Sequence, residues 1–515
     1  MPSVYDRRAM PMSSRKAPVL AMPPDTIPSS RVASSMPSLG PGRLLGAGLA
    51  VAFVLHVALR AALSHSVERD EAEQLLWTQA LAWGYGTQPP LYTWLQWLVF
   101  QALGVSVLSL ALLKNGLLAG TYAFTWLAAR RLLAPAAAAL AAASMVLLPQ
   151  IGWESHRDLT HSVLLTTASA ATLWLMIELR HAPRTGLYIA LGVALAAGAL
   201  AKYSFALLPA ALAVAALPDP AARRALLDRR LALTLAVAAL LVAPHGLWML
   251  QHREAAVGET AAKLQIEAGL GTGRIVRGLG SLALAAVAFL TPWWLVTAAL
   301  FGRGLGARAA GRDAAVHALF MRYLALIAAM LAALVVLGGA AHFKDRWLQP
   351  YLFFAPLIAF VAFPQLAAHP RLRWLGRLVA GLALAMAAAL AARVPLDGWR
   401  GRANQLNVPV EAIADAVRAQ GVEPALVASG DKHLVGALRL VFPGAHAVHV
   451  DAGAGAVALP PSPGPVLLIA PAERFAELQA AVPAAASATP VQLALPVRYG
   501  ESRPQRVRFA YVVLR

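Results

Sequence analysis

The sequence has no cysteine among its 515 residues, and two functional motifs are missing as well. Without thiols the chain forms no disulfide, binds no metal through thiolates and has no cysteine nucleophile. No Asp-x-Asp motif occurs, so metal-dependent transfer from a nucleotide sugar has no support. No Gly-x-x-x-x-Gly-Lys loop occurs either, which excludes ATP-driven transport as the function. The possible metal ligands show no specific spacing, and we therefore expect neither a metal nor another cofactor.

Charge is scarce too: 13% of the residues are charged, whereas 59% are apolar. A soluble domain has about 45–50% apolar and about 25% charged residues. The apolar residues here form long runs with almost no charge, and runs of about 20 residues match a bilayer core about 30 Å thick. The clearest runs are 44–63, 107–127, 231–250 and 375–390. The sequence therefore predicts an α-helical protein that crosses a membrane many times.

We count about eleven expected transmembrane helices in this pattern. Segment 185–217 is divided into two short helices, because arginine loops flank it on both sides and Lys202 interrupts it in the middle. The eleven segments lie near residues 44–63, 107–129, 133–150, 160–179, 185–201, 204–217, 231–250, 278–300, 316–337, 347–364 and 374–393.

The net charge of +19 comes from basic residues in short loops between the apolar runs. These loops alternate along the chain and so share one side, which the positive-inside rule makes cytoplasmic. The distribution indicates orientation in the cytoplasmic membrane and no nucleic-acid partner. The basic residues of this side are Arg130, Arg131, Arg180, Arg184, Arg223, Arg224, Arg229, Arg230, Arg303, Arg308, Arg312, Arg371, Arg373 and Arg377.

Composition divides the chain into three parts. Residues 1–42 are rich in Pro, Ser and Met without an apolar period, which predicts a disordered cytoplasmic tail. Residues 43–393 form the transmembrane domain, whose first outer loop is 64–106. From residue 394 short strand-like and helical runs alternate, which predicts a small α/β domain over 394–515. An odd number of spans after a cytoplasmic N-terminus places this domain outside the membrane.

The first outer loop opens with a cluster of acidic residues, Glu68, Asp70, Glu71 and Glu73. Four carboxylates beside a membrane surface are unfavourable unless a ligand uses them. The simpler interpretation makes Asp70 a helix N-cap, with Glu73 completing an Asp-x-x-Glu capping box. The two interpretations are compatible, because a carboxylate at a helix start is held in a fixed place. Amphipathic segments at 71–83 and 91–103 are expected to lie along the interface.

These residues, with others at later positions, resemble bacterial members of glycosyltransferase family 39, a family that includes the lipid A aminoarabinose transferases and is related to protein O-mannosyltransferases. The resemblance covers roughly residues 44–365. It is carried by Asp70-Glu71, Ala82-Trp83-Gly84-Tyr85, Gln88-Pro89-Pro90-Leu91, Ala201-Lys202-Tyr203-Ser204 and Lys344-Asp345-Arg346-Trp347-Leu348-Gln349-Pro350.

The resemblance implies a GT-C fold and transfer of a sugar from a polyprenyl-phosphate carrier to an envelope acceptor, which is a lipid, a glycan or a protein. Catalysis then lies at the outer face of the cytoplasmic membrane. The acceptor hydroxyl must lose a proton as it attacks, so a carboxylate base is needed. Asp70 is expected to be this base. Glu71 is expected to orient the acceptor or to act as the base in place of Asp70. A single base fits one displacement with inversion at the anomeric carbon.

The lipid phosphate that leaves needs fixed cations. Arg346 is the first candidate because its planar fork binds two oxygens, and Lys344 and Lys202 are further candidates. All three residues are also compatible with anchoring at the membrane interface.

Further expected contacts to the substrates come from Tyr85 and Gln88 in the first loop and from an intramembrane lysine, Lys114. Relatives often carry Lys or His where Gln88 stands. The contact that this basic residue is expected to make with the phosphate or the sugar is therefore not assigned here. Relatives also carry an acid early in the fourth span, a role that falls here to Asp158 or to His161. For Lys114 we expect Asp158 or Glu154 as partner, or a purely structural ion pair.

Two other functions fit a polytopic protein of this size. A transporter or flippase of a lipid-linked sugar commonly shows an internal repeat, and none is visible here. An O-antigen polymerase or ligase concentrates basic and polar residues in a large late outer loop, whereas the acidic cluster here lies in the first loop.

Overall fold

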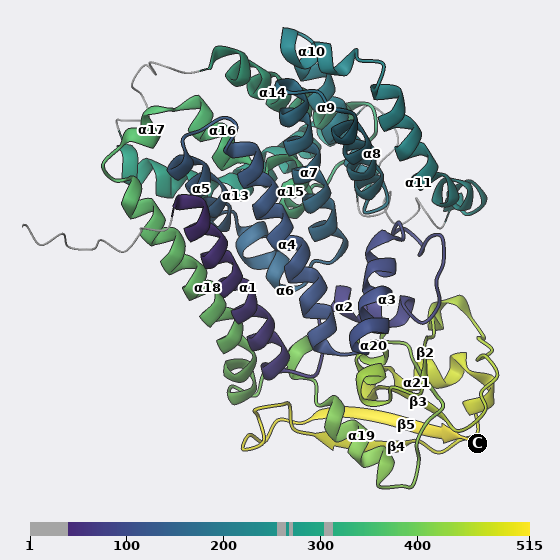
Figure 1. Ribbon diagram of the computed structural model, residues 1–515. Helices are drawn as coiled ribbons and strands as arrows, with labels where there is room; N and C mark the ends of the chain where they lie inside the picture. Colours follow the sequence, from purple (N-terminus) through teal and green to yellow (C-terminus); the bar gives the residue numbers. More distant parts are fainter. Residues whose placement is uncertain (1–39, 255–263, 267–270, 303–312) are drawn as a thin grey trace, which may run out of the picture. The chain divides into compact units, whose positions relative to one another are not determined.

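The computed structural model describes residues 40–254, 264–266, 271–302 and 313–515. Most of the expected tail (1–42) and the basic residues Arg303, Arg308 and Arg312 lie outside the described residues. The first helix, α1, begins at Pro41. Figure 1 shows the helices of the transmembrane part and the strands of the C-terminal part.

Within the described residues, seven helices are long and apolar enough to cross a membrane. They correspond to seven of the expected spans and share a length of 21 residues or more. They are α1 (Pro41–Leu63), α4 (Val107–Ala129), α7 (His161–His181), α11 (Leu231–Gln251), α13 (Thr272–Phe301), α14 (Ala314–Val336) and α18 (Leu372–Trp399).

The remaining expected spans are helical but short or broken, so the count of eleven stays a prediction. Segment 133–150 is not one straight span: two helical stretches, 135–147 and 150–157, meet at an angle of 76°. The break lies at Pro149, whose ring cannot donate a helical hydrogen bond. The shorter elements are α5 (Pro135–Ala143), α6 (Ser155–Arg157), α8 (Thr185–Ala199), η3 (Tyr203–Ala206), α9 (Leu207–Ala216), α10 (Pro220–Leu226), η5 (Asp345–Leu348), α15 (Gln349–Leu352), α16 (Ala355–Ala362) and α17 (Gln365–Ala368).

The expected division of segment 185–217 is present, because α8 ends at Ala199 and the next helical turn begins at Tyr203. Lys202 lies in the break between them. A single long helix would have reversed the orientation of every later element. The division excludes a single unbroken helix over segment 185–217, and its crossing of the membrane as two separate spans stays a prediction.

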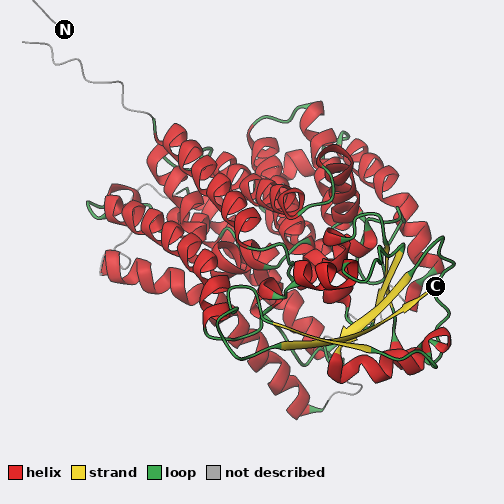
Figure 2. Ribbon diagram, turned by 90° about the horizontal axis from the view of Figure 1, so that it is seen from below, coloured by secondary structure: helices red, strands yellow, loops and turns green. Residues whose placement is uncertain are grey.

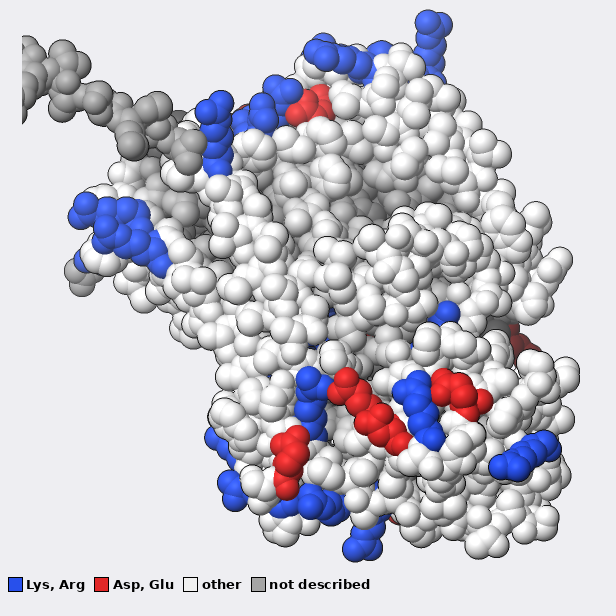
Figure 3. All heavy atoms as spheres, turned by 60° about the horizontal axis from the view of Figure 1, so that its bottom comes forward, with Lys and Arg blue, Asp and Glu red and all other residues white. Residues whose placement is uncertain are grey.

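Burial separates the inner helices from those that face lipid. Helix α7 is mostly buried, whereas no residue of α1 is. On the face drawn in Figure 3, Lys and Arg dominate the upper edge, charges of both signs gather over the lower part, and the band between them is almost uncharged. An uncharged band of this kind is what a bilayer core requires.

Two short helices follow α1 in the first outer loop. The second, α3 (Leu91–Leu103), begins directly after Pro90 and has the predicted bounds. The first, α2, covers Arg69–Trp77, so the expected helix at 71–83 starts two residues too late and ends six residues too late.

The C-terminal part is the expected small α/β domain. Its sheet has the order β2-β1-β3-β5-β4, in which β1 is parallel to β2 and β3, and β5 is antiparallel to β3 and β4. Figure 2 shows the strands in yellow. Helix α18 continues to Trp399, beyond the expected boundary at 393. The elements are α19 (Val410–Arg418), β1 (Leu426–Ser429), α20 (Lys432–Val441), β2 (His446–His449), β3 (Val466–Pro471), α21 (Ala472–Ala481), β4 (Val491–Leu495) and β5 (Val507–Leu514).

The C-terminal domain packs directly on α2. Ala72 and Leu75 of α2 belong to the same buried cluster as Leu434 and Leu438 of α20. Arg439 of α20 donates to the carbonyl of Leu75 and, at 2.9 Å, to the Thr78 hydroxyl. Gln79, just after α2, exchanges two hydrogen bonds with the backbone of Ala447, at 2.7 and 2.8 Å. The helix that begins with the acidic cluster is thus fixed by the C-terminal domain.

These two helices approach each other closely at Gly436, where a Cβ atom would lie 2.7 Å from the carbonyl oxygen of Ala72. We expect Gly436→Val to lower the free energy of unfolding by about 1–3 kcal/mol, the usual cost of overpacking. Gly444→Val is the matched control, because nothing lies within 4 Å of a Cβ there. Thermal unfolding in detergent measures both. Equal unfolding temperatures for the two variants would contradict this packing.

Candidate active site

Asp70 lies in the first turn of α2 and is not its N-cap. The cap is Glu68, and its backbone N–H donates to the Glu71 carboxylate at 3.1 Å. The capping box therefore joins Glu68 and Glu71, and the expected box of Asp70 with Glu73 is wrong. Because its side chain is not used to cap α2, Asp70 is available for another role.

The surroundings of Asp70 bring together residues that are far apart in the sequence. Its backbone N–H donates to Oδ1 of Asp158 at 3.0 Å, and its Oδ2 accepts from the N–H of Thr160 at 3.4 Å. Burial and the charge of Asp158 raise the pKa of Asp70 to about 6, while the charges of Lys202 and Arg346 oppose this rise. Four predicted residues, Asp70, Asp158, Lys202 and Arg346, thus form one electrostatic cluster.

Short structured turns hold the two cations of this cluster. Lys202 precedes η3, and its Nζ donates to Oγ of Ser162 at 2.8 Å. Arg346 lies in η5, where its backbone N–H donates to Asp345 at 2.7 Å. The other carboxylate oxygen of Asp345 accepts from Gln150 at 2.6 Å, which ties η5 to the break after α5. These contacts fix the side chain of Lys202 and the backbone turn that carries Arg346.

The structure does not join Lys344 to this cluster. Lys344 is exposed at the start of η5, and no described contact connects it with Asp70. Its expected part in phosphate binding stays a prediction.

Glu71, the next residue after Asp70, lies in a different environment. Its carboxylate is buried and accepts from Arg60 at 2.7 Å and from Lys114 at 2.8 Å. Burial raises the pKa of the Glu71 carboxyl, but the two cations outweigh it and lower the pKa to about 2. Both oxygens of Glu71 are therefore engaged within the protein, an arrangement that fixes α2 against α1 and α4.

The partner of Lys114 differs from both expected ones. Lys114 binds Glu71, whereas Glu154 pairs with Arg157 at 2.9 Å and Asp158 bonds to Asp70. The structural ion pair, which the sequence left as an alternative, is the arrangement observed. The predicted contact of Lys114 with a substrate has no support from this geometry.

His161 is buried near the cluster among aromatic and amide groups. Its Nε2 lies 3.2 Å from Nε2 of Gln74, and the rings of Trp77 and Tyr92 are 6.0 and 5.3 Å from its ring. The Gln74 side chain also accepts from the hydroxyl of Thr93 at 2.9 Å. Asp158, and not His161, bonds directly to Asp70, which favours Asp158 over His161 for the expected acid of the fourth span, and this assignment stays a prediction.

Tyr85 and Gln88 shape the loop between α2 and α3. Their backbones exchange hydrogen bonds of 3.0 and 3.1 Å. The Tyr85 hydroxyl donates to the carbonyl of Ala80 at 2.9 Å, and the ring stacks on Trp77 at 5.6 Å. Both residues are partly exposed, and their predicted contacts with substrates stay predictions.

Two buried residues of the site were not predicted from the sequence. Tyr92 is close enough to the acidic residues that burial, then the charges of Glu71 and Asp70, raise its pKa well above the usual range. Gln349 is fully buried and donates to the hydroxyls of Ser155 and Thr166 at 3.1 and 3.0 Å. A polar residue in an apolar run was the available signal in both cases. Among the described residues, no group of three His, Asp or Glu side chains is arranged to hold a metal.

The double ion pair of Glu71 leads to a stability prediction. Glu71→Gln leaves Arg60 and Lys114 without their shared counter-charge, and we expect a loss of about 3–5 kcal/mol in the free energy of unfolding. Glu423→Gln is the matched control, because its pair with Arg418 is exposed and adds little. Thermal unfolding compares the two variants. A Glu71→Gln protein as stable as the control would contradict the structural role of this carboxylate.

Known proteins resemble this chain over most of its length. A family model described as dolichyl-phosphate-mannose-protein mannosyltransferase matches residues 87–248. Lipopolysaccharide core galacturonosyltransferase RgtB of Rhizobium johnstonii is 37% identical over 407 residues, which cover 78% of this chain and 82% of that protein. Lipopolysaccharide core galacturonosyltransferase RgtA of the same organism is 36% identical over 427 residues, which cover 82% and 85%.

The fold agrees with these relationships. The crystal structure of ArnT from Cupriavidus metallidurans bound to undecaprenyl phosphate superposes with a TM-score of 0.60 at 15% identity, covering 91% of this chain and 98% of that one. The fold and the family expected from the sequence are thereby confirmed, and membership of an enzyme family sets the transporter alternative aside. The chain belongs to the GT-C membrane glycosyltransferases of the family 39 type, together with the galacturonosyltransferases RgtA and RgtB.

Proposed function

We propose that this protein transfers galacturonic acid from a polyprenyl-phosphate carrier to lipopolysaccharide, with inversion at the anomeric carbon. The observation that carries the proposal is the cluster of Asp70 and Asp158 with Lys202 and Arg346. It combines a carboxylate suited to accept a proton with two cations suited to bind an anionic leaving group. The galacturonosyl group and the acceptor are taken from the names of the relatives RgtA and RgtB.

Asp70 serves as the general base. A base works best when its pKa is near the operating pH, and the pKa of about 6 leaves Asp70 mostly ionised at neutral pH. Asp158 assists in two ways. Its charge makes Asp70 more basic, and its hydrogen bond to the Asp70 backbone fixes the first turn of α2.

Lys202 and Arg346 bind the donor. As the acceptor oxygen forms its bond to the anomeric carbon, the bond from that carbon to the phosphate oxygen breaks, and the electron pair stays on the phosphate. Fixed cations stabilise this growing charge. A galacturonosyl donor carries a sugar carboxylate besides its phosphate. Two cations at separate turns, Lys202 just before η3 and Arg346 in η5, suit two anionic groups.

We propose that the reaction takes place at the outer face of the cytoplasmic membrane. The arginines in alternate short loops define the cytoplasmic side by the positive-inside rule, and the loop that carries Asp70 lies at the other end of α1. The lipid carrier then presents its sugar at the membrane surface, where α2 and α3 lie.

The direct test is an assay with purified protein, a polyprenyl-phosphate galacturonic acid donor and lipopolysaccharide core as acceptor. Mass spectrometry should show one added uronic acid, and NMR should show an anomeric configuration opposite to that of the donor. Carriers of a neutral hexose and of an amino sugar are the matched controls. Use of either control carrier in place of the uronosyl donor would overturn the assignment of the sugar. Retention of the anomeric configuration of the donor would overturn the proposed single displacement.

The raised pKa of Asp70 predicts the pH dependence of kcat/KM. Asp70 must be ionised, so the rate should fall tenfold per pH unit as the pH drops below about 6. Asp158→Asn removes the neighbouring like charge and should move this midpoint to lower pH, whatever its effect on the maximum rate. Asp415→Asn, on the exposed side of α19, should leave the midpoint in place. A midpoint that stays or rises in Asp158→Asn would contradict the coupling.

A further inference from the structure

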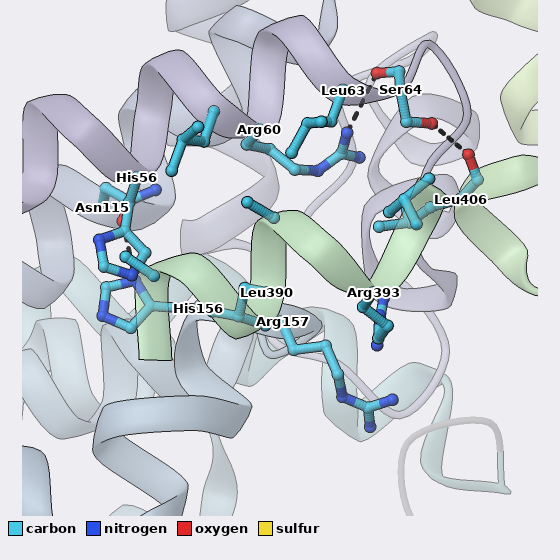
Figure 4. A pocket seen from close by; sticks show the side chains of 14 residues that line it. His56, Arg60, Leu63, Ser64, Asn115, His156, Arg157, Leu390, Arg393 and Leu406 are labelled. Carbon is cyan, nitrogen blue, oxygen red and sulfur yellow. Dashed lines mark hydrogen bonds between the residues drawn. The ribbon is translucent and has the colours of Figure 1, made fainter. Parts of the chain in front are cut away.

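A pocket lies between α1, α4, α6 and α18, with one residue from the start of the C-terminal domain (Figure 4). None of the cluster residues Asp70, Asp158, Lys202 and Arg346 lines it. Helices α1 and α18 lie side by side in Figure 1, and few of their side chains are buried. The pocket is therefore a feature separate from the proposed active site, at a helix pair that faces lipid.

The charged residues that line the pocket are all cationic. Arg60, Arg157 and Arg393 are among the lining residues, and no Asp or Glu is. Each of these arginines pairs with a carboxylate that is not part of the lining: Arg60 with Glu71, Arg157 with Glu154 and Arg393 with Glu68. The charged side chains that line the space are therefore cationic, while the carboxylates that balance them lie outside the lining.

The arginines keep hydrogen-bonding capacity after these pairs are made. Within the described part of the chain, the Nε atoms of Arg60 and Arg393 are buried and have no partner. A guanidinium N–H can only donate, so both atoms need an acceptor. An anion with several oxygens, such as a phosphate, supplies acceptors to more than one arginine at once.

The opposite end of the pocket offers an acceptor. Nδ1 of His56 lies 2.8 Å from the carbonyl of Ala52, so this nitrogen carries the proton and Nε2 holds a lone pair when the ring is neutral. Nε2 is buried, and no described group bonds to it. The ring stacks on His156 at 3.9 Å. A hydroxyl of the same ligand would satisfy this nitrogen.

Apolar side chains form the rest of the wall. Leu59 and Leu63 come from α1, and Leu390 and Ala391 come from α18. Leu63 is the last residue of α1, so the pocket lies near the end of the helix that leads to α2. A cationic centre with an apolar wall at the end of a transmembrane helix suits a molecule with an anionic head and an acyl chain.

We propose that this pocket binds the headgroup of an anionic lipid, which carries a phosphate and a hydroxyl. The phosphate accepts from Arg60 and Arg393, the hydroxyl donates to His56, and the chain lies along α1 and α18. The occupant would also affect the proposed active site, because Arg60 binds Glu71 beside Asp70, and Arg157 directly precedes Asp158. Membrane phospholipid and the phosphorylated lipid of the acceptor share this chemistry.

Native mass spectrometry of the purified protein tests the site independently of transfer activity. The protein is titrated with phosphatidylglycerol, with phosphatidylcholine as the zwitterionic control and with acceptor lipopolysaccharide in a parallel series. Arg393→Gln removes one cation, and Ala391→Leu fills the pocket without changing any charge. Arg400→Gln is the matched control, because Arg400 is exposed at the end of the same helix. Thermal unfolding confirms that each variant is folded.

Wild type and Arg400→Gln should retain an anionic lipid, while both pocket variants should bind it about tenfold more weakly or not at all. Retention of phosphatidylglycerol identifies membrane lipid as the source, and retention of lipopolysaccharide alone identifies the acceptor. Equal retention in all four proteins would overturn the site, as would binding of phosphatidylcholine with the same affinity. If Arg393→Gln fails to fold, Ala391→Leu alone decides between these outcomes.

Discussion

The buried ion pairs of Glu71 with Arg60 and Lys114 are the constraint on which the site depends. Taking a carboxylate and two cations out of water is costly unless they pair closely, so α1, α2 and α4 must keep one relative position. From the other side, α20 of the C-terminal domain holds α2 through Arg439 and the close approach at Gly436. The short helix is thus fixed on two faces, and Asp70 in its first turn is fixed with it.

Two consecutive carboxylates of α2 have opposite environments. Cations lower the pKa of Glu71 to about 2, while burial and Asp158 raise the pKa of Asp70 to about 6. Two neighbouring acids whose pKa values are shifted in opposite directions are suited to different roles. Glu71 remains charged and stabilises the fold. Asp70 is held in a charged state that burial disfavours, which favours taking up a proton from an acceptor hydroxyl.

Much of the site could be predicted from the sequence, because membrane topology limits where polar residues go. Asp70, Asp158, Lys202 and Arg346 stand at breaks between apolar runs on one side, and the fold brings them together.

The start of α2 was missed because four acids in six residues offer more than one capping box. The partner of Lys114 was missed because ion pairs between helices depend on the rotation of each helix, which hydropathy does not determine. The bend at Pro149 explains why span counting by length is uncertain there.

The most direct test of the account compares turnover and thermal stability of Asp70→Asn with wild type. Asparagine keeps the shape and the acceptor for the Thr160 N–H but has no basicity, so kcat should fall by about 10²–10⁴-fold. The unfolding temperature should hold or rise at neutral pH, because a partly buried charge beside Asp158 is removed. Asp70→Glu, which keeps the charge but shifts it by a methylene, should also be severely impaired. Near-normal turnover of a stable Asp70→Asn protein would contradict the assignment of Asp70 as the base.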